Sequence, residues 1–389
     1  MTFTTTTVAL PPAAAGHAPA FARPDFPMTR TPLLLACAAA LCATLPAARA
    51  GELPFSFAPT ANVQYEWSEV DADTAPTDGE HGFRRGRLGF RLQGKDKHWQ
   101  FVAEHDFAER TPADAYLEWT PVDGQSLRVG QFKQPFTLED ANSDKQTAFL
   151  EPSFVGGFAI SRRIGAEYAR FGKRGTLNIA VFDQRLDGTN DSRGATMRGT
   201  WVLHADADGV LHVGASLASE SPAVPRASFS ANPGTVFTGV RVASTGGIDG
   251  VERIDRAALE GLWLHGPWTL QAETAQVRAH RDTAADFHGN ASSLLLTWSP
   301  NGARSYKRGV AAAPTPKGHA VWEFGLRWSA IDLDDSGVAG GHADSIGLAA
   351  ACYVNKYVRV IGDVLHVDSD RRGVETSPVV AGVRFQFTY

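Results

Sequence analysis

The chain has 389 residues, 43% of them hydrophobic and 20% charged, with a formal net charge of -5. This size and composition exclude a disordered chain and allow one large domain or two ordinary ones. The 38 glycines and 10% aromatic residues favour many strands joined by turns, and the acidic balance argues against nucleic acid as a partner.

The N-terminal region has the composition of an export signal. Residues 1–27 show no structural pattern, and we interpret them as a non-translated or disordered extension. A short basic start, an apolar run over residues 33–45 and a small-residue cleavage site at 48–50 follow. The apolar run is too short to span a bilayer. We therefore expect residues 28–50 to be a cleaved signal peptide and residues 51–389 to be exported.

Cysteine usage limits how the exported part can be stabilised. Cys37 and Cys42 lie within the signal, so the exported chain keeps only Cys352. One cysteine forms no internal disulfide and cannot build a cysteine zinc site, so we expect neither a metal site nor a cofactor.

Beyond residue 51 the main pattern is an alternation of apolar and polar residues. It is clear in the segments 99–108, 114–120, 321–329 and 378–389. Alternation of this kind is typical of strands with one apolar and one polar face, and it predicts an all-β fold.

Such strands suit a soluble sandwich or an outer-membrane barrel, and three features favour the barrel. The polar faces carry charges of both signs, tryptophans lie near strand ends, and the chain ends within a strand on Tyr389. The roughly 340 exported residues, at about 20 per strand and loop, correspond to about sixteen strands. We therefore predict a transmembrane antiparallel β-barrel whose wide interior is an aqueous channel rather than a packed core.

The connections between strands fall into two groups. Short ones suit the periplasmic end, at 94–98, 121–125 and 171–175. Longer polar ones suit the outside, at 69–81, 219–253 and 278–289. The segment 132–163 contains no clean strand, with a possible short helix over 137–149. A long insertion of this kind is usually functional, and we expect it to fold inward as a constriction loop.

Five segments resemble the family of phosphate-selective porins O and P. They are FRRGRLGF at 83–90, SLRVGQFKQPFTLED at 126–140, LLLTWSPNGARSYKRG at 294–309, HAVWEFGLRWSAIDL at 319–333 and GLAAACYVNKYVRVIGDVLHVDSD at 347–370. The resemblance spans nearly the whole exported chain in order. It implies a sixteen-stranded, trimeric outer-membrane channel that passes anions, with phosphate or polyphosphate as the solute in the best-known members.

The resemblance also suggests which residues lie at the narrowest part of the pore. Arg84 and Arg85 match the paired arginines that face this part in the family. Strict alternation allows only one of the two to face the lumen, so a bulge is required. Phosphate-selective members carry a lysine where this chain has Asp140 and an arginine where it has Pro152.

The inward loop of phosphate-selective members is rich in arginine. Its nearest counterpart here is the segment 219–247, which contains only Arg226 and Arg241. The chain therefore resembles the family in its strands and differs from it at the phosphate site.

Charged residues on the polar faces form the candidate solute path. The basic candidates are Arg84, Arg85, Arg87, Arg91, Arg128, Lys133, Arg163, Arg327, Arg359 and Arg384, and the candidate lumen carboxylates are Glu104, Asp106, Asp114 and Glu118. Because arginine stays protonated in proteins, these side chains either attract anions or are neutralised by ion pairs across the strands. The sequence leaves both interpretations open.

The motifs of common enzymes are absent from the sequence, which contains neither G-x-S-x-G nor H-E-x-x-H. We therefore expect an outer-membrane porin, not an enzyme, that passes small anions such as phosphate or polyphosphate by passive diffusion. Its partners would be those solutes, outer-membrane lipid and lipopolysaccharide, and two further copies in a homotrimer. The alternatives are a general channel, or one selective for sugars or organic acids, and an adhesive barrel with a blocked lumen.

Overall fold

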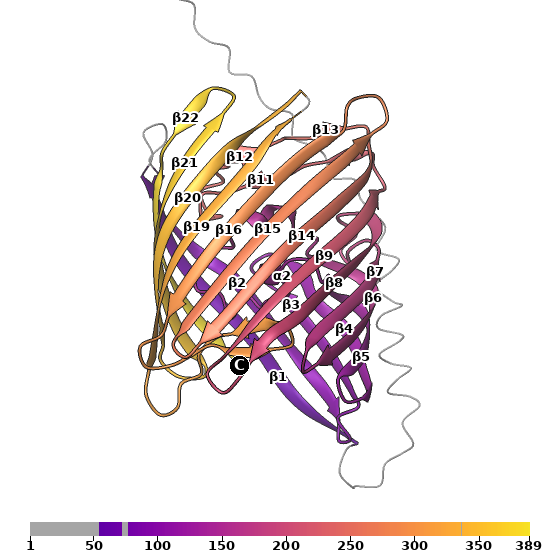
Figure 1. Ribbon diagram of the computed structural model, residues 1–389, viewed down its shortest axis with the longest axis vertical. Helices are drawn as coiled ribbons and strands as arrows, with labels where there is room; N and C mark the ends of the chain where they lie inside the picture. The colour runs from indigo at the N-terminus through magenta and orange to yellow at the C-terminus, as the bar shows by residue number, and fades with distance from the viewer. Residues whose placement is uncertain (1–53, 72–76, 336) are drawn as a thin grey trace, which may run out of the picture. The chain divides into compact units, whose positions relative to one another are not determined.

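The computed structural model describes residues 54–71, 77–335 and 337–389. The expected N-terminal extension, signal peptide and cleavage site all lie outside the described residues. Within them, sixteen long antiparallel strands form a closed barrel, as the sequence predicted (Figure 1). The first strand pairs with the last, Asn62 lying opposite Thr388, and this pairing closes the barrel.

The barrel strands run along the chain in order, each beside the next. They are β1 (Phe55–Asp71), β2 (Thr77–Gly94), β3 (Trp99–Asp106), β4 (Thr111–Val122), β5 (Gln125–Lys133), β6 (Arg162–Gly172), β7 (Gly175–Phe182), β8 (Ser192–Ala205), β9 (Gly209–Pro222), β14 (Val251–His265), β15 (Trp268–Arg281), β16 (Phe287–Trp298), β19 (Val321–Asp335), β20 (Val338–Tyr353), β21 (Val358–Arg371) and β23 (Val379–Thr388).

Shorter elements lie in the connections. The helical ones are α2 (Leu138–Ala141) and the 3-10 helix η1 (Phe154–Phe158). The short strands are β10 (Arg226–Ala227), β11 (Ser230–Ala231), β12 (Ala243–Ser244), β13 (Ile248–Asp249), β17 (Ser305–Lys307), β18 (Val310–Ala312) and β22 (Val374–Thr376). No helix among the described residues is long and apolar enough to cross a membrane.

The outer face of the barrel is apolar, the reverse of a soluble protein. On β19, Trp322, Phe324 and Trp328 are 41–46% exposed, whereas Glu323 and Arg327 between them are nearly fully buried. Aromatic rings line one end of this face, where Trp298 stacks on Trp268 with ring centroids 5.9 Å apart. This arrangement is the one expected of a barrel surrounded by lipid, with an aromatic girdle at the membrane surface.

The two ends of the barrel differ. We call the end that holds the start of β1 and the end of β23 the turn end, because it also holds the tight turns 123–124, 173–174 and 266–267. The opposite end is the loop end. Its connections include the segments 134–161 and 223–250.

Several expectations about the connections were wrong. The loops expected over 69–81 and 219–253 were too long at both ends, since β1 extends to Asp71, β2 begins at Thr77, β9 extends to Pro222 and β14 begins at Val251. Residues 278–281, which we assigned to a loop, continue β15 and pair with β14, as in Ala279 opposite Ile254. The loop there is only 282–286. In addition, the long segment 299–320 belongs to the turn end, where we expected only short turns. The strand ends are set by hydrogen bonding between strands, which composition alone does not reveal.

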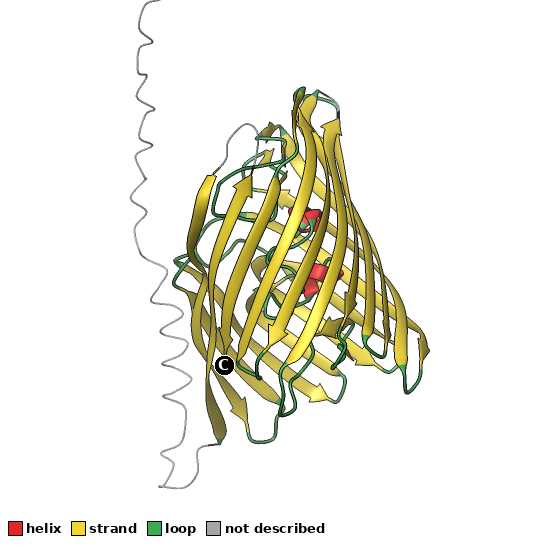
Figure 2. Ribbon diagram, turned by 90° about the vertical axis from the view of Figure 1, so that its left-hand side faces the viewer, coloured by secondary structure: helices red, strands yellow, loops and turns green. Residues whose placement is uncertain are grey.

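The interior is not the uniform aqueous channel that the barrel width suggested. The segments 134–161 and 223–250 turn inward, and the helical elements lie inside the barrel (Figure 2). There, η1 and the loop 223–250 form an apolar core with the inner faces of β14–β16 and β19–β21. In this core Phe229 stacks on Phe287, and Phe158 packs edge-on against Phe229, both at 5.8 Å between centroids.

Candidate pore constriction

The constriction loop, residues 134–161, connects β5 to β6 and fills the middle of the barrel. Its helix α2 is shorter than the helix expected over 137–149. Thr137 caps α2 by accepting a hydrogen bond from the backbone N–H of Asp140 at 3.1 Å. The helix ends at Asn142, whose extended backbone breaks the turn while its side chain accepts from Ser143 N–H at 2.9 Å.

A cavity of about 170 Å³ lies between this loop and the strands at the beginning of the barrel. Six basic residues and four carboxylates line it. The basic residues are Arg84, Arg85, Arg87, Lys133, Arg162 and Arg384, and the carboxylates are Glu139, Asp140, Asp144 and Glu151. The cavity therefore combines the polar, charged lining of a solute path with a small volume.

A bulge in β2 brings both Arg84 and Arg85 to this cavity. Opposite β1, the register shifts between Gln64, which faces Arg85, and Tyr65, which faces Phe83. Arg84 is the extra residue, so the arginine pair escapes strict alternation. Arg84 binds Glu109 at 3.1 Å, and Arg85 forms a short ion pair with the same carboxylate.

Asp144 joins the loop to two arginines of β2. Its carboxylate lies 2.7 Å from Arg87 and 3.3 Å from Arg85. Burial alone would raise the pKa of Asp144, but the charges of Arg87, Lys133 and Arg85 outweigh it and hold that pKa far below its ordinary value. Asp144 therefore stays ionised and offsets part of the positive charge of the cavity.

Glu151 is the main anchor of the loop. Its carboxylate lies 2.6 Å from Arg84 and 2.8 Å from Arg384, which also binds Glu66. Burial raises the pKa of Glu151, but the charges of the nearby Arg84 and Arg384 outweigh this effect and hold the pKa below its ordinary value. The backbone oxygen of Glu151 accepts a hydrogen bond from Arg327 at 2.8 Å.

The other candidate carboxylates pair with arginines on other strands, with one exception. Asp106 lies 3.0 Å from Arg87, Glu118 lies 2.6 Å from Arg128, and Asp114 binds Arg162 at 2.9 Å. Neither Glu104 nor the exposed Arg91 forms an ion pair with a described residue. Crossed ion pairs of this kind are what the neutralisation alternative described.

Four of the candidate basic residues outside β2, Lys133, Arg327, Arg359 and Arg384, hold the constriction loop. Arg327 packs over the Phe149 ring at 4.2 Å, Arg359 donates to Thr147 O at 2.8 Å, and all three of Arg327, Arg359 and Arg384 are at most 4% exposed. Lys133 lies 3.3 Å from Asp140. Buried guanidinium groups that donate to loop carbonyls fix the position of the loop.

Arg162 is a cavity residue that sequence reasoning missed in favour of its neighbour Arg163. Arg163 is nearly fully buried and donates to the Arg162 backbone oxygen at 3.0 Å. Arg162 and Arg163 are adjacent arginines, as Arg84 and Arg85 are. Arg162 lies opposite Lys133 in the pairing of β5 with β6, and that register could have identified Arg162 as the cavity residue.

A third inward segment comes from the turn end, and its inward course was not expected. Residues 299–320 hold the hairpin of β17 and β18, which reaches the constriction loop. Arg304 links the two, because it pairs with Glu323 at 2.7 Å and donates to Gln146 O at 2.9 Å. Asn142 of the loop donates to Ala311 O of the hairpin at 3.1 Å.

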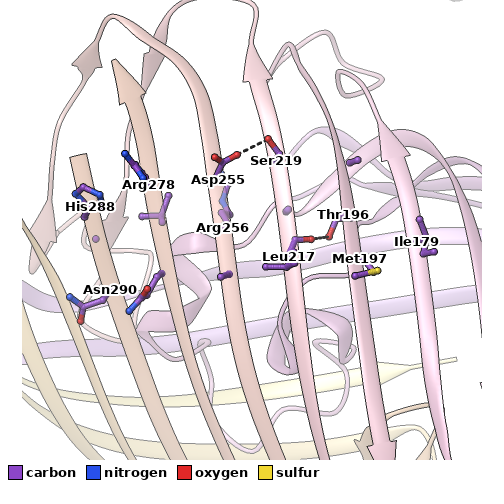
Figure 3. A pocket seen from close by; sticks show the side chains of 16 residues that line it. Ile179, Thr196, Met197, Leu217, Ser219, Asp255, Arg256, Arg278, His288 and Asn290 are labelled. Atoms are coloured by element: carbon purple, nitrogen blue, oxygen red, sulfur yellow. Dashed lines mark hydrogen bonds between the residues drawn. The ribbon is translucent and has the colours of Figure 1, made fainter. Parts of the chain in front are cut away.

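A larger cavity of about 760 Å³ lies elsewhere, on the outer face of β7–β9 and β14–β16 (Figure 3). Exposed outward residues of these strands, including Ile179, Met197, Leu217 and Arg278, line it, and Asp255 accepts a hydrogen bond from Ser219 at 2.6 Å. Because its exposed side chains point away from the lumen, this groove belongs to the surface around the barrel and not to the channel.

A closed, lipid-facing barrel with an inward loop and a charged constriction defines an outer-membrane porin. The chain belongs to the family of phosphate-selective porins O and P, whose family model matches residues 57–389. The match covers nearly all of the described barrel and confirms the resemblance seen in the five sequence segments. A search of curated proteins gives no match.

Solved structures share the fold at low sequence identity. OmpT of Vibrio cholerae, described in a trimer form, has a TM-score of 0.57 at 10% identity, with 87% of this chain and 100% of that chain covered. An anion-selective porin from Comamonas acidovorans has a TM-score of 0.54 at 14% identity, covering 86% and 100%. The outer-membrane channel DcaP of Acinetobacter baumannii has a TM-score of 0.57 at 10% identity, covering 88% and 100%.

The family and these folds support an outer-membrane location and point to a channel rather than an enzyme. At 10–14% identity the neighbours establish the architecture only.

Proposed function

We propose that the protein is a porin through which small anions diffuse passively, with a weak rather than a strong preference for anions. The main support is the row of three arginines, Arg84, Arg85 and Arg87, that lines the 170 Å³ cavity at the constriction. Field lines from charges in a narrow, low-dielectric passage are concentrated, so an anion that enters meets these guanidinium groups at close range.

The proposed path runs along β1 to β6, past Arg84, Arg85 and Arg87. A guanidinium there replaces part of the hydration shell of a passing anion. Glu109 and Asp144 stay close to the same arginines, so a bound anion competes with them for hydrogen bonds. That competition keeps binding weak and release fast.

Tight phosphate binding is disfavoured by two residues of the loop. Asp140 replaces the family lysine and pairs with Lys133, which removes one free positive charge from the cavity. Pro152 replaces the family arginine and contributes no donor. Phosphate or polyphosphate would then pass as one of several anions.

The alternative is a general channel, or one for sugars or organic acids. The observation in its favour is that most arginines of the wall already have a carboxylate partner, as in the pairs Arg128–Glu118 and Arg162–Asp114. If these pairs cancel the local field, the lumen provides hydrogen bonds without charge selection.

We further propose that the protein works as a homotrimer in the outer membrane, after removal of residues 28–50, with its outer face in contact with lipid and lipopolysaccharide. The turn end would face the periplasm, as short turns do in such barrels. The trimeric form described for one neighbour supports the oligomeric state.

Planar-bilayer recording tests the proposal. In a KCl gradient we expect a reversal potential whose sign shows that chloride is more permeable than potassium. Arg85→Ala should move this reversal potential toward zero. The matched control is Arg278→Ala, an exposed arginine on the outer face of the barrel, which should leave the reversal potential unchanged. A cation-preferring wild type would refute anion preference, and a wild type without conductance would support the adhesive barrel.

A further inference from the structure

A separate basic cluster lies at the loop end, apart from the constriction. A cavity of about 370 Å³ is lined by Arg241 of the loop 223–250 and by Arg371 and Arg372 of the hairpin between β21 and β22. None of the described residues that line it is acidic. The three arginines come from segments 130 residues apart in sequence, so the fold itself brings them together.

These arginines have unused hydrogen-bonding capacity. None of the three forms an ion pair with a described residue. Arg372 donates to Ala339 O at 3.4 Å, and Arg241 donates to the adjacent Val240 O at 3.3 Å. The Nε of Arg371 is buried and has no hydrogen-bond partner. A buried guanidinium N–H without an acceptor is costly unless a ligand supplies one.

The hairpin holds Arg372 in a strained backbone conformation. Arg372 and Gly373 have φ values of 58° and 73°, and Arg371 pairs with Val374 around them. Two central residues with positive φ form the turn that suits a two-residue hairpin, in which Asn or Gly is the ordinary first residue. An arginine there costs stability without an evident structural benefit, and such strain is often found at ligand sites.

The remaining lining gives the cavity a polar edge and an apolar floor. Ser369 and Thr376 share a hydrogen bond of 2.8 Å between their hydroxyls, while Val70, Val242 and Pro378 form the floor. The nearest acids of the hairpin, Asp370 and Glu375, lie opposite each other in the register. They alternate with Arg371, so their side chains are expected on the other face of the hairpin.

We propose that this rim site binds an organic anion, a carboxylate or phosphate group carried on an apolar body, before it enters the channel. The arginines would hold the anionic group and the valine and proline floor would cover the apolar part. The site goes beyond the proposed function, since it would bind such an anion whether or not the constriction selects for charge.

Isothermal titration of the full, folded barrel in detergent with benzoate tests this site, with acetate as a probe of equal charge but no apolar body. We expect benzoate to bind more tightly than acetate, and Arg371→Ala with Arg372→Ala to weaken benzoate by at least about tenfold, which corresponds to about 1.4 kcal/mol. The matched control, Arg226→Ala, removes an exposed rim arginine that pairs with Asp249 and should change nothing.

Two further variants keep the test decisive if the double change disturbs folding. Arg241→Ala changes the loop 223–250 and leaves the hairpin intact, and it should also weaken benzoate binding. Arg372→Asn should stabilise the turn while still weakening benzoate binding. Equal affinity for benzoate and acetate, or unchanged affinity in Arg241→Ala and Arg372→Asn, would overturn the proposal. The reversal potential in a chloride gradient depends on the constriction and not on the rim site. Absence of benzoate binding in the wild type, with the expected anion-preferring reversal potential, therefore counts against the rim site alone, and a cation-preferring reversal potential counts against the proposed function alone.

Discussion

The two sides of the barrel interior differ sharply. Along β1 to β6 the inward side chains are mostly charged or amide-bearing, as with Gln64, Glu66 and Arg87, and a cavity remains beside them. Along β14 to β21, toward the loop end, the inward residues are mostly apolar, as with Ala275 and Leu333, and an apolar core fills the space.

This difference shows how a wide barrel can hold a narrow pore. The small inward residues Ala258, Ala275, Ala279 and Ala291 let the loops pack closely against one wall. The apolar core fixes those loops on that side, and the charged side is left for water and solute. The apolar wall thus sets the position of the pore, because it holds the loops, and the opposite wall sets the charge of the pore.

The largest expected effect comes from opening the apolar side. Phe158 is fully buried in that core, so Phe158→Ala should lower the free energy of unfolding by about 3–5 kcal/mol. The loosened loop should also raise single-channel conductance. Urea unfolding in detergent measures the first effect, and Phe324→Ala on the lipid face is the control that should cost less. Equal losses in both variants would contradict the packed core.

The next effect comes from the charged side. Glu151→Gln should cost about 3 kcal/mol, because it leaves the buried Arg84 and Arg384 without their shared carboxylate. Glu109→Gln is the matched control, since the 44% exposed Glu109 also binds Arg84 and should cost less than about 1 kcal/mol. If the two variants unfold alike, Glu151 is not the anchor of the loop.

A smaller change should move the pore toward phosphate. Asp140→Lys removes the partner of Lys133 and restores the basic residue of phosphate-selective members. We expect phosphate to inhibit chloride current at about tenfold lower concentration, a gain of about 1.4 kcal/mol. Asp140→Asn, which removes charge without adding any, should give an intermediate value. No difference among the three proteins would place the solute path elsewhere.

The smallest effect is a dependence on pH. Asp144 and Glu151 have lowered pKa values, so the unfolded chain binds more protons than the folded one once the pH falls below about 4.5. Their contribution to stability is complete above that pH and is lost as the pH falls further. Unfolding free energy should therefore change little from these groups between pH 8 and 5 and decline below 4. A decline that began near pH 6 would show that other groups dominate.

The sequence predicted the barrel well because its signals are local. Alternation in 321–329 and 378–389 assigned Trp322, Phe324 and Arg384 to the correct faces, and the length gave the number of strands. The arginine pair at 84–85 indicated the bulge of β2 from the sequence alone. Each of these depends only on residues near one another in the chain.

Within the constriction the sequence identified residue types but not their partners. It selected Arg84, Arg85 and Lys133 yet missed Arg162, because choosing between neighbours requires the register of β5 with β6. It did not reveal the partners of Arg304, because Glu323 and Gln146 lie on other elements.

By itself, then, the sequence determined a lipid-facing barrel with charged inner faces, since a period of two residues fixes which side chains point outward. Only the tertiary structure decided which part of the interior is packed and which is polar. That choice depends on where the loops 134–161 and 223–250 settle, and they settle through contacts with strands far away in the chain, such as Leu150 with Asp363. Such long-range contacts leave no periodic signal in the sequence.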